Sequence, residues 1–180
     1  MKQVLAIIGS ANTQSANLYV VQQLATLAQN KFRITIYNKL KELPHFDPDL
    51  SVGDTPSAVL ELRQQIADAE GIIISTPEYV FSIPSGLKNA IEWCVATTIF
   101  AGKPTGLITA AASGLKGHEE LQLIMRTVEA RFTEATTLLI QGIKGKQDAH
   151  GAITDEKTQT ELLDFVDAFA QLLGPADTIG

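Results

Sequence analysis

The sequence of 180 residues lacks several features that would direct it to particular classes of protein. It has a single cysteine, Cys94, which cannot form a disulfide within the chain and agrees with a reducing compartment. No apolar run approaches the length that is needed to span a bilayer, so we expect no membrane segment. The three histidines, at 45, 118 and 150, have no ligand spacing with one another or with Cys94, so we expect no metal site.

Basic residues are in the minority. Lys and Arg number 14 against 20 Asp and Glu, which gives a formal net charge of −6. This acidic balance argues against nucleic acid and anionic membranes as main partners. An apolar run follows directly after Met1-Lys2-Gln3 and leaves no room for a signal peptide, so we expect a cytoplasmic protein. The length predicts one domain over residues 1–180, without internal repeats.

Three motifs that mark common enzyme sites are also missing. The sequence has no Gly-Lys-Ser/Thr P-loop, no Gly-x-Gly-x-x-Gly dinucleotide fingerprint and no Gly-x-Ser-x-Gly nucleophile elbow. Because the elbow is missing and Ser10 has no evident base, a hydrolase is a poor hypothesis. Cys94 lies beside Trp93 on a helical apolar pattern, and we interpret it as a buried core residue in preference to a reactive thiol.

What the sequence does contain is an alternation of strand and helix patterns. Apolar runs at 4–8 and 71–75 are typical of strands buried on both faces, and the alternating run at 32–37 is typical of a sheet edge. Residues 105–112 and 135–140 supply two more strands, and apolar stripes with helical spacing lie between them. This order predicts a doubly wound α/β fold of flavodoxin-like type, with a five-stranded parallel sheet in the order 2-1-3-4-5 and helices on both faces.

Local signals predict several details of these elements. The first helix runs to about Asn30, and residues 43–50, which hold two prolines and no period, form a loop. Thr55, before Pro56, is expected to cap the next helix. Thr154, together with the acidic pair that follows it, is expected to cap the last helix.

The loop after the first strand is rich in small residues that form hydrogen bonds. It runs from Gly9 to Asn17, at the start of a helix, and its side-chain donors include three hydroxyls and two asparagine amides: Ser10, Thr13, Ser15, Asn12 and Asn17. Unpaired N–H groups and the positive end of the helix dipole favour a phosphate there. Because the loop has no Lys or Arg, neutral hydrogen bonds would hold that phosphate, as suits a terminal monophosphate. It is equally open that Ser15 serves only as the N-cap of the helix and holds no phosphate.

Two other loops follow strands that end beside the first one. Residues 76–83 come before a helix and could seat a planar heteroaromatic ring, and residues 112–118 are small enough for the backbone to approach the opposite edge of that ring. In a doubly wound sheet the three loops converge on one crevice. A phosphate and a flat ring together describe a flavin mononucleotide, FMN.

Two stretches carry a family resemblance. Gly9-Ser10, followed by Ser15 and Asn17, and the long run from Thr76-Pro77-Glu78-Tyr79 to Glu92-Trp93 resemble the NADPH-dependent FMN reductases. This family includes quinone, chromate and azo-dye reductases with a flavodoxin-like fold. The resemblance implies a phosphate site in the first loop and ring contacts from the other two. The candidate FMN-binding residues are Ser10, Asn12, Ser15, Ala16, Asn17, Pro77, Glu78, Tyr79, Val80, Phe81, Ser113 and Gly114.

The sequence departs from the family's pattern at three places. Asn12 stands where the family usually has Arg, which removes a cation that can assist the flavin phosphate or the pyridine nucleotide. Val80 replaces the usual Asn and removes one polar contact at the ring, although its backbone N–H remains. Gly117-His118 stands in place of the family's Gly-Gly.

The resemblance implies an FMN-dependent oxidoreductase. In the expected ping-pong cycle, NADPH or NADH delivers hydride and leaves, and a quinone or another small-molecule oxidant then takes the electrons. No catalytic side chain is expected, and Glu78 is more simply a structural hydrogen-bond acceptor than a group that tunes a proton step. The resemblance also implies a homodimer or homotetramer.

Two alternatives of other classes stay open at this point. One is an FMN-binding electron carrier or sensor, and the other is a degenerate binding module, which Asn12 and Val80 encourage.

Overall fold

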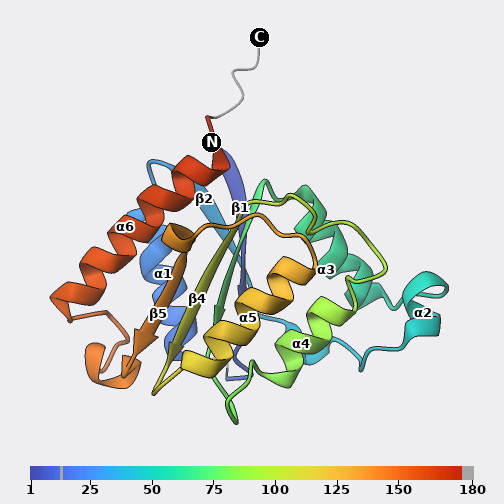
Figure 1. Cartoon of the computed structure of the whole chain (residues 1–180), viewed down its shortest axis with the longest axis horizontal. Helices are drawn as coiled ribbons and strands as arrows, with labels where there is room; N and C mark the ends of the chain where they lie inside the picture. The colour runs from blue at the N-terminus through green and yellow to red at the C-terminus, as the bar shows by residue number, and fades with distance from the viewer. Residues whose placement is uncertain (13, 176–180) are drawn as a thin grey trace.

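Parallel strands and helices alternate along the chain in the computed structural model, which describes residues 1–12 and 14–175 (Figure 1). The strands are β1 (Lys2–Ile8), β2 (Phe32–Tyr37), β3 (Gly71–Thr76), β4 (Thr105–Ala111) and β5 (Thr137–Gln141). The α-helices are α1 (Ala16–Leu27), α2 (Pro48–Val52), α3 (Ser57–Asp68), α4 (Ser85–Glu92), α5 (Leu115–Thr127) and α6 (Glu156–Leu173). Three short 3₁₀ helices complete the described elements: η1 (Leu40–Glu42), η2 (Glu134–Thr136) and η3 (Ile143–Lys146).

The five strands form one parallel sheet in the order β2-β1-β3-β4-β5. This confirms the predicted flavodoxin-like topology, and the alternating strand β2 lies at the edge, as its pattern predicts. In the register, Val4 lies opposite Gly71 and Ile8 lies opposite Ser75. The carboxyl ends of β1 and β3 therefore meet at the same edge of the sheet.

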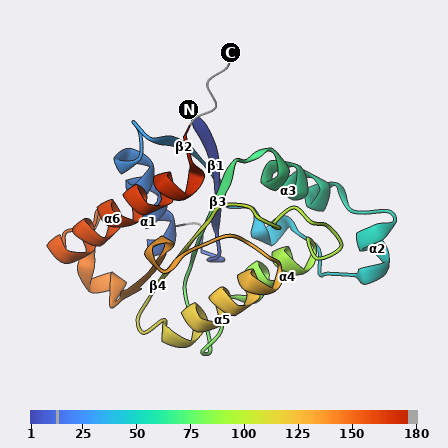
Figure 2. The ribbon, with the colours of Figure 1, turned by 45° about the horizontal axis from the view of Figure 1, so that its top comes forward.

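Helices cover both faces of the sheet. Figures 1 and 2 show α1 and α6 on one face and α3, α4 and α5 on the other. Each face has its own hydrophobic core, and β1 contributes to both: Val4 and Ala6 point to the α1/α6 side, and Leu5 and Ile7 to the opposite side. Successive side chains of a strand alternate between faces, so an uninterrupted apolar run is what a strand buried on both sides requires.

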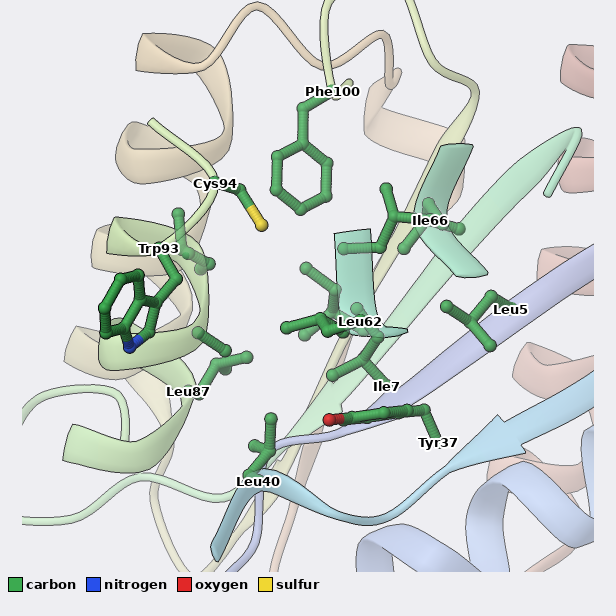
Figure 3. Packing of buried hydrophobic residues seen from close by; sticks show 14 of the residues in the cluster. Leu5, Ile7, Tyr37, Leu40, Leu62, Ile66, Leu87, Trp93, Cys94 and Phe100 are labelled. Carbon is green, nitrogen blue, oxygen red and sulfur yellow. The ribbon is translucent and has the colours of Figure 1, made fainter. Parts of the chain in front are cut away.

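The core on the α3/α4/α5 side includes Cys94, as predicted. Figure 3 shows its sulfur pointing toward the ring of Phe100, in a cluster that also contains Leu62 and Ile66. Burial raises the pKa of the Cys94 thiol to about 12. The thiol is therefore protonated at neutral pH and behaves as a small apolar side chain.

Some local expectations were wrong. Residues 43–50 are not all loop, because Asp47 caps the short helix α2 by accepting from the Asp49 N–H at 2.9 Å. Pro56, and not Thr55, occupies the N-cap position of α3; the Thr55 hydroxyl donates backward to the Leu50 carbonyl at 2.8 Å. Helix α1 ends at Leu27, three residues before the expected Asn30.

Other local expectations hold. Ser15 is the N-cap of α1, and its hydroxyl oxygen accepts from the Leu18 N–H at 3.2 Å. The predicted segment also caps α6, but its N-cap is Asp155 and not Thr154: Asp155 accepts from the Thr158 N–H at 3.0 Å, and the Thr154 hydroxyl donates to the Lys146 carbonyl. None of the helices in residues 1–12 and 14–175 combines the length and the apolar character that a membrane crossing needs.

Candidate functional site

A pocket of about 700 Å³ lies at the carboxyl ends of the strands, where the sequence predicts a crevice. This volume is within the range of about 300–1,000 Å³ that is usual for small-molecule sites. Four segments line it: the loop after β1, the loop after β3, the end of β4 and the loop after β5. The lining residues from these segments and the start of α1 are Ser10, Asn12, Gln14, Ser15, Ala16, Asn17, Tyr19, Pro77, Glu78, Tyr79, Ala110, Ala111, Ala112, Gly142, Ile143, Lys144, Gly145 and Gln147.

Gly9 allows the ends of β1 and β3 to approach each other beneath the pocket. Its N–H donates to the Ser75 carbonyl at 2.8 Å. A Cβ added to Gly9 would lie 2.4 Å from Oγ1 of Thr76 and 2.6 Å from its Cβ. Because Thr76 is fully buried, a larger residue at position 9 would force the two strand ends apart.

The loop after β1 arranges its own polar groups before any ligand binds. The Ser10 hydroxyl oxygen accepts from the Asn12 N–H at 3.2 Å, and Oδ1 of Asn12 accepts from the Gln14 N–H at 3.1 Å. Ser15 accepts in the same way as the N-cap of α1. The hydroxyl hydrogens of Ser10 and Ser15 are therefore left to donate to an anion in the pocket. Thr13, the third hydroxyl of the predicted loop, lies outside the described residues.

The start of α1 adds backbone donors to this wall of the pocket. Ala16 and Asn17 belong to the first helical turn, whose N–H groups have no carbonyl partner within the helix. That turn contains no acidic side chain. The positive end of the helix dipole therefore acts on the pocket without local neutralisation.

The side chain of Asn17 is used by the fold. It is 2% exposed, and its Nδ2 donates to the Ala110 carbonyl at 3.0 Å while its Oδ1 accepts from the Ser75 hydroxyl at 3.0 Å. These bonds attach α1 to the ends of β3 and β4. The backbone N–H is therefore what Asn17 can offer to a phosphate.

Glu78 also has a structural role. It accepts hydrogen bonds within the protein, as the sequence favours. Its Oε1 accepts from the Gly114 N–H at 3.1 Å, and its Oε2 accepts from the Gly117 N–H at 2.8 Å. These donors lie at the N-terminus of α5, where a carboxylate is stabilised by the helix dipole. A second carboxylate, Glu120 of α5, accepts from the Ile83 N–H at 2.9 Å and completes the attachment of the β3 loop to α5.

Gly117 and His118, where the sequence departs from the family's pattern, lie in the first turn of α5, next to the hydrogen bonds of Glu78. A Cβ added to Gly117 would lie 3.2 Å from Cβ and Cγ of Glu78. His118 is buried, and its Nδ1 shares a hydrogen bond of 2.9 Å with the Thr109 hydroxyl of β4. Burial lowers the pKa of His118, which favours the neutral ring at pH 7.

The structure brings together some of the predicted FMN contacts and separates others. Pro77, Glu78 and Tyr79 line the pocket with the predicted residues of the first loop. Val80 and Phe81 do not line it; they form the tip of a turn that two hydrogen bonds close between Tyr79 and Ser82, and they are 95% and 75% exposed. Ser113 and Gly114 lie just beyond the lining, to which the end of β4 and the residue after it contribute Ala110, Ala111 and Ala112. Contacts of these four residues with FMN stay predictions.

Sequence reasoning missed one wall of the pocket. Gly142, Ile143, Lys144, Gly145 and Gln147, all from the loop after β5, line it. The signal was available, because β5 ends at the same edge of the sheet as β4 and the loop carries glycines and lysines. The sequence alone does not show that this loop folds back over the start of α1, where Nε2 of Gln147 donates to the Ala16 carbonyl at 3.4 Å.

A family model described as NADPH-dependent FMN reductase matches residues 2–144 of the chain. The chain belongs to this family. This confirms the predicted resemblance, and with it FMN as the cofactor and NAD(P)H as the co-substrate of an oxidoreductase. The flavodoxin-like fold and the position of the pocket agree with that assignment.

Individual relatives support the assignment over nearly the whole chain. A quinone reductase of Escherichia coli strain K12 is 30% identical over 179 residues, which cover 95% of each chain. A 2-hydroxy-1,4-benzoquinone reductase from Burkholderia sp. is 31% identical over 175 residues, which cover 93% of this chain and 94% of the relative. The solved structure of FerB, a flavoenzyme NAD(P)H:acceptor oxidoreductase from Paracoccus denitrificans, has a TM-score of 0.85 at 29% identity, covering 96% of this chain and 97% of FerB.

The donors of the pocket fit FMN. Hydroxyl and N–H donors gather at the start of α1, as a phosphate requires, and the segments after β3 and β4 offer a largely uncharged lining for a ring. The charged residues of the lining are Glu78 and Lys144, and both oxygens of Glu78 are engaged. Among the described residues of the chain, no group of three or more His, Cys, Asp or Glu side chains could hold a metal ion.

Proposed function

We propose that this FMN reductase transfers electrons from NADPH or NADH to quinones or other small oxidants, with FMN bound in the pocket of about 700 Å³. The observation that carries the proposal is the convergence of the first-loop donors and the β3 loop on one pocket at the carboxyl ends of the strands. Relatives that are named as quinone reductases support the choice of oxidant. Family membership supports an enzyme over a carrier or a degenerate module.

Each wall of the pocket has its own task in this proposal. The hydroxyls of Ser10 and Ser15, with the N–H groups of Ala16 and Asn17, hold the phosphate, and Asn12 lies beside them. The segments 77–79 and 110–112 hold the ring from two sides. Bound FMN supplies the hydride chemistry, and the chain positions it.

Glu78, the carboxylate among the described residues of the lining, is not free to act as an acid or base. Both of its oxygens accept backbone N–H groups. We therefore assign proton exchange to solvent, which reaches the pocket past the half-exposed ring of Tyr79. One open face serves the nicotinamide and the oxidant in turn, as a ping-pong reaction requires.

We propose further that the protein is a cytoplasmic homodimer or homotetramer. The exposed apolar tip formed by Val80 and Phe81, at the rim of the pocket, supports a subunit contact, because burying it would remove apolar surface from water. Sedimentation equilibrium measures the subunit number, and a monomer at micromolar concentration would contradict this proposal.

Anaerobic absorbance spectroscopy tests the reaction. The FMN-loaded protein is mixed with NADPH or NADH in the absence of oxygen, and we expect the yellow colour to bleach. Adding a benzoquinone to the bleached protein should restore the colour and produce the hydroquinone. A protein that binds FMN but does not bleach with either nucleotide would contradict the proposal.

A further inference from the structure

Lys144 is the cation of the pocket lining, and its charge has no partner in the described part of the chain. It lies on η3, it is exposed, and no hydrogen bond or ion pair of its side chain is found within residues 1–12 and 14–175. The carboxylate in the same lining, Glu78, is fully used at the N-terminus of α5. The free charge of the pocket is therefore positive, in a protein whose net charge is −6.

The neighbouring lysine of the same turn has a different environment. Nζ of Lys146 donates to Oδ1 of Asp155 at 3.2 Å and to the Thr158 hydroxyl at 3.0 Å, so it fastens η3 to the start of α6. Lys146 thus holds η3 in place, whereas Lys144 lines the pocket and has no such partner among the described residues. A surface ion pair explains the position of Lys146 but not that of Lys144.

The turn that carries Lys144 is held beside the phosphate loop. At its beginning, the Gly142 N–H donates to the Ala112 carbonyl at 3.1 Å, at the end of β4. At its end, Nε2 of Gln147 donates to the Ala16 carbonyl at 3.4 Å, in the first turn of α1. Lys144 lies between these two attachments. Its flexible side chain therefore lines the same pocket as the first turn of α1, which holds the unpaired N–H donors.

We infer that Lys144 binds the phosphate of FMN and supplies, from the loop after β5, the cation that Asn12 does not supply from the loop after β1. The inference rests on the proposed occupation of the pocket by FMN. A phosphate monoester carries a charge near −2 at pH 7, and an ammonium group nearby adds an attraction that neutral hydroxyls lack. The 2′-phosphate of NADPH has the same chemistry, but the attachment of η3 to the start of α1 favours the FMN phosphate.

The test compares FMN with riboflavin, which lacks the phosphate. Apo-protein is titrated with each flavin, and flavin fluorescence reports the dissociation constant for wild type, Lys144→Met and Lys41→Met. Methionine keeps most of the aliphatic stem and removes the charge. Lys41 is a matched control, because it is exposed, lies on the 3₁₀ helix η1 and is outside the pocket lining.

We expect Lys144→Met to raise the dissociation constant of FMN about fivefold at about 0.05 M salt and to leave that of riboflavin unchanged. The difference should shrink at about 0.5 M salt, because ions screen exposed charges. Lys144→Arg should restore most of the affinity, and Lys41→Met should behave as wild type.

Three other results would overturn the inference. Equal FMN affinity in Lys144→Met and Lys41→Met would show that Lys144 does not touch the phosphate. An equal loss for FMN and riboflavin would mean that Lys144 shapes the pocket. Unchanged FMN affinity with a lowered preference for NADPH over NADH would assign Lys144 to the nucleotide. Each of these leaves the proposed function intact, whereas a wild-type protein that binds neither flavin contradicts both proposals.

Discussion

The two sides of the pocket use polar groups in opposite ways. On the α1 side, Ser10 and Ser15 accept hydrogen bonds from their own loop, and within residues 1–12 and 14–175 their hydroxyl hydrogens have no acceptor. On the α5 side, Glu78 and Glu120 give their oxygens to backbone N–H groups of facing segments. The α1 side is thus left with donors for a ligand, and the α5 side is rigid because its polar groups are satisfied. The difference shows that a polar side chain in a binding loop need not be a ligand-binding group.

Gly9 supports both sides, and replacing it should have the largest effect. Gly9→Ala places a Cβ against the buried Thr76, so we expect a loss of about 3 kcal/mol in the free energy of unfolding. Urea denaturation measures this loss. Gly145→Ala is the control, because no atom of the described residues lies within 4 Å of its added Cβ, and we expect a change within about 0.5 kcal/mol. Equal stability of the two variants would contradict the close approach of β1 and β3.

Glu78→Gln tests the rigid side. The amide of glutamine keeps one acceptor and turns an N–H₂ group toward a backbone donor, and it also removes the charge at the start of α5. We expect a loss of about 2 kcal/mol in apo-protein stability, measured by thermal or urea unfolding without flavin. Glu119→Gln, on α5 itself but exposed and paired with Lys116, should change stability little. A stable apo-protein with weakened FMN binding would mean that Glu78 is a ligand-binding group after all.

Ser15 tests the binding side, because two substitutions separate its two roles. Ser15→Ala removes the N-cap and the hydroxyl donor, so we expect about 1 kcal/mol less stability and weaker FMN binding. Ser15→Asp keeps a good N-cap and adds a negative charge, so stability should stay near wild type while FMN affinity falls further. Unfolding and flavin titration of both variants give the answer. If FMN affinity followed stability in both, Ser15 would be an N-cap and nothing more.

Val80→Asn should have the smallest effect, and it extends the comparison of the two sides to the rim of the pocket. Val80 and Phe81 have φ angles of 53° and 60°, a region that a β-branched residue seldom adopts and that asparagine tolerates. We expect Val80→Asn to stabilise the protein by about 0.5 kcal/mol, measured by urea denaturation. Phe81→Leu, which leaves Val80 in its left-handed conformation, should give no such gain in stability. A destabilised Val80→Asn variant would show that the valine is held by a contact such as that of a second subunit.

Much of the fold was predictable because its determinants are local. The apolar runs of β1 and β3, the alternating pattern of β2 and the Ser15 cap each follow from a few consecutive residues. The prediction for Thr55 was wrong because the next residue, Pro56, occupies the N-cap position of α3. The hydroxyl of Thr55 donates to the Leu50 carbonyl of the preceding turn and does not cap the helix. The helix at 48–52 is short and capped by Asp47, and so brief a helix shows no apolar period.

The sequence by itself determined the order of the strands, the edge of the sheet at which the pocket lies and the donor-rich loop that lines it, because strand periodicity and chain order require no distant contact. Only the tertiary structure decided which of those polar groups remain free. The side chain of Asn17 is hydrogen-bonded to residues of β3 and β4, and Glu78 is hydrogen-bonded to α5. Lys144 lines the pocket from the loop after β5, far from the first loop in the sequence. Hydrogen bonds between segments that are distant in sequence make these assignments, and no local pattern encodes them.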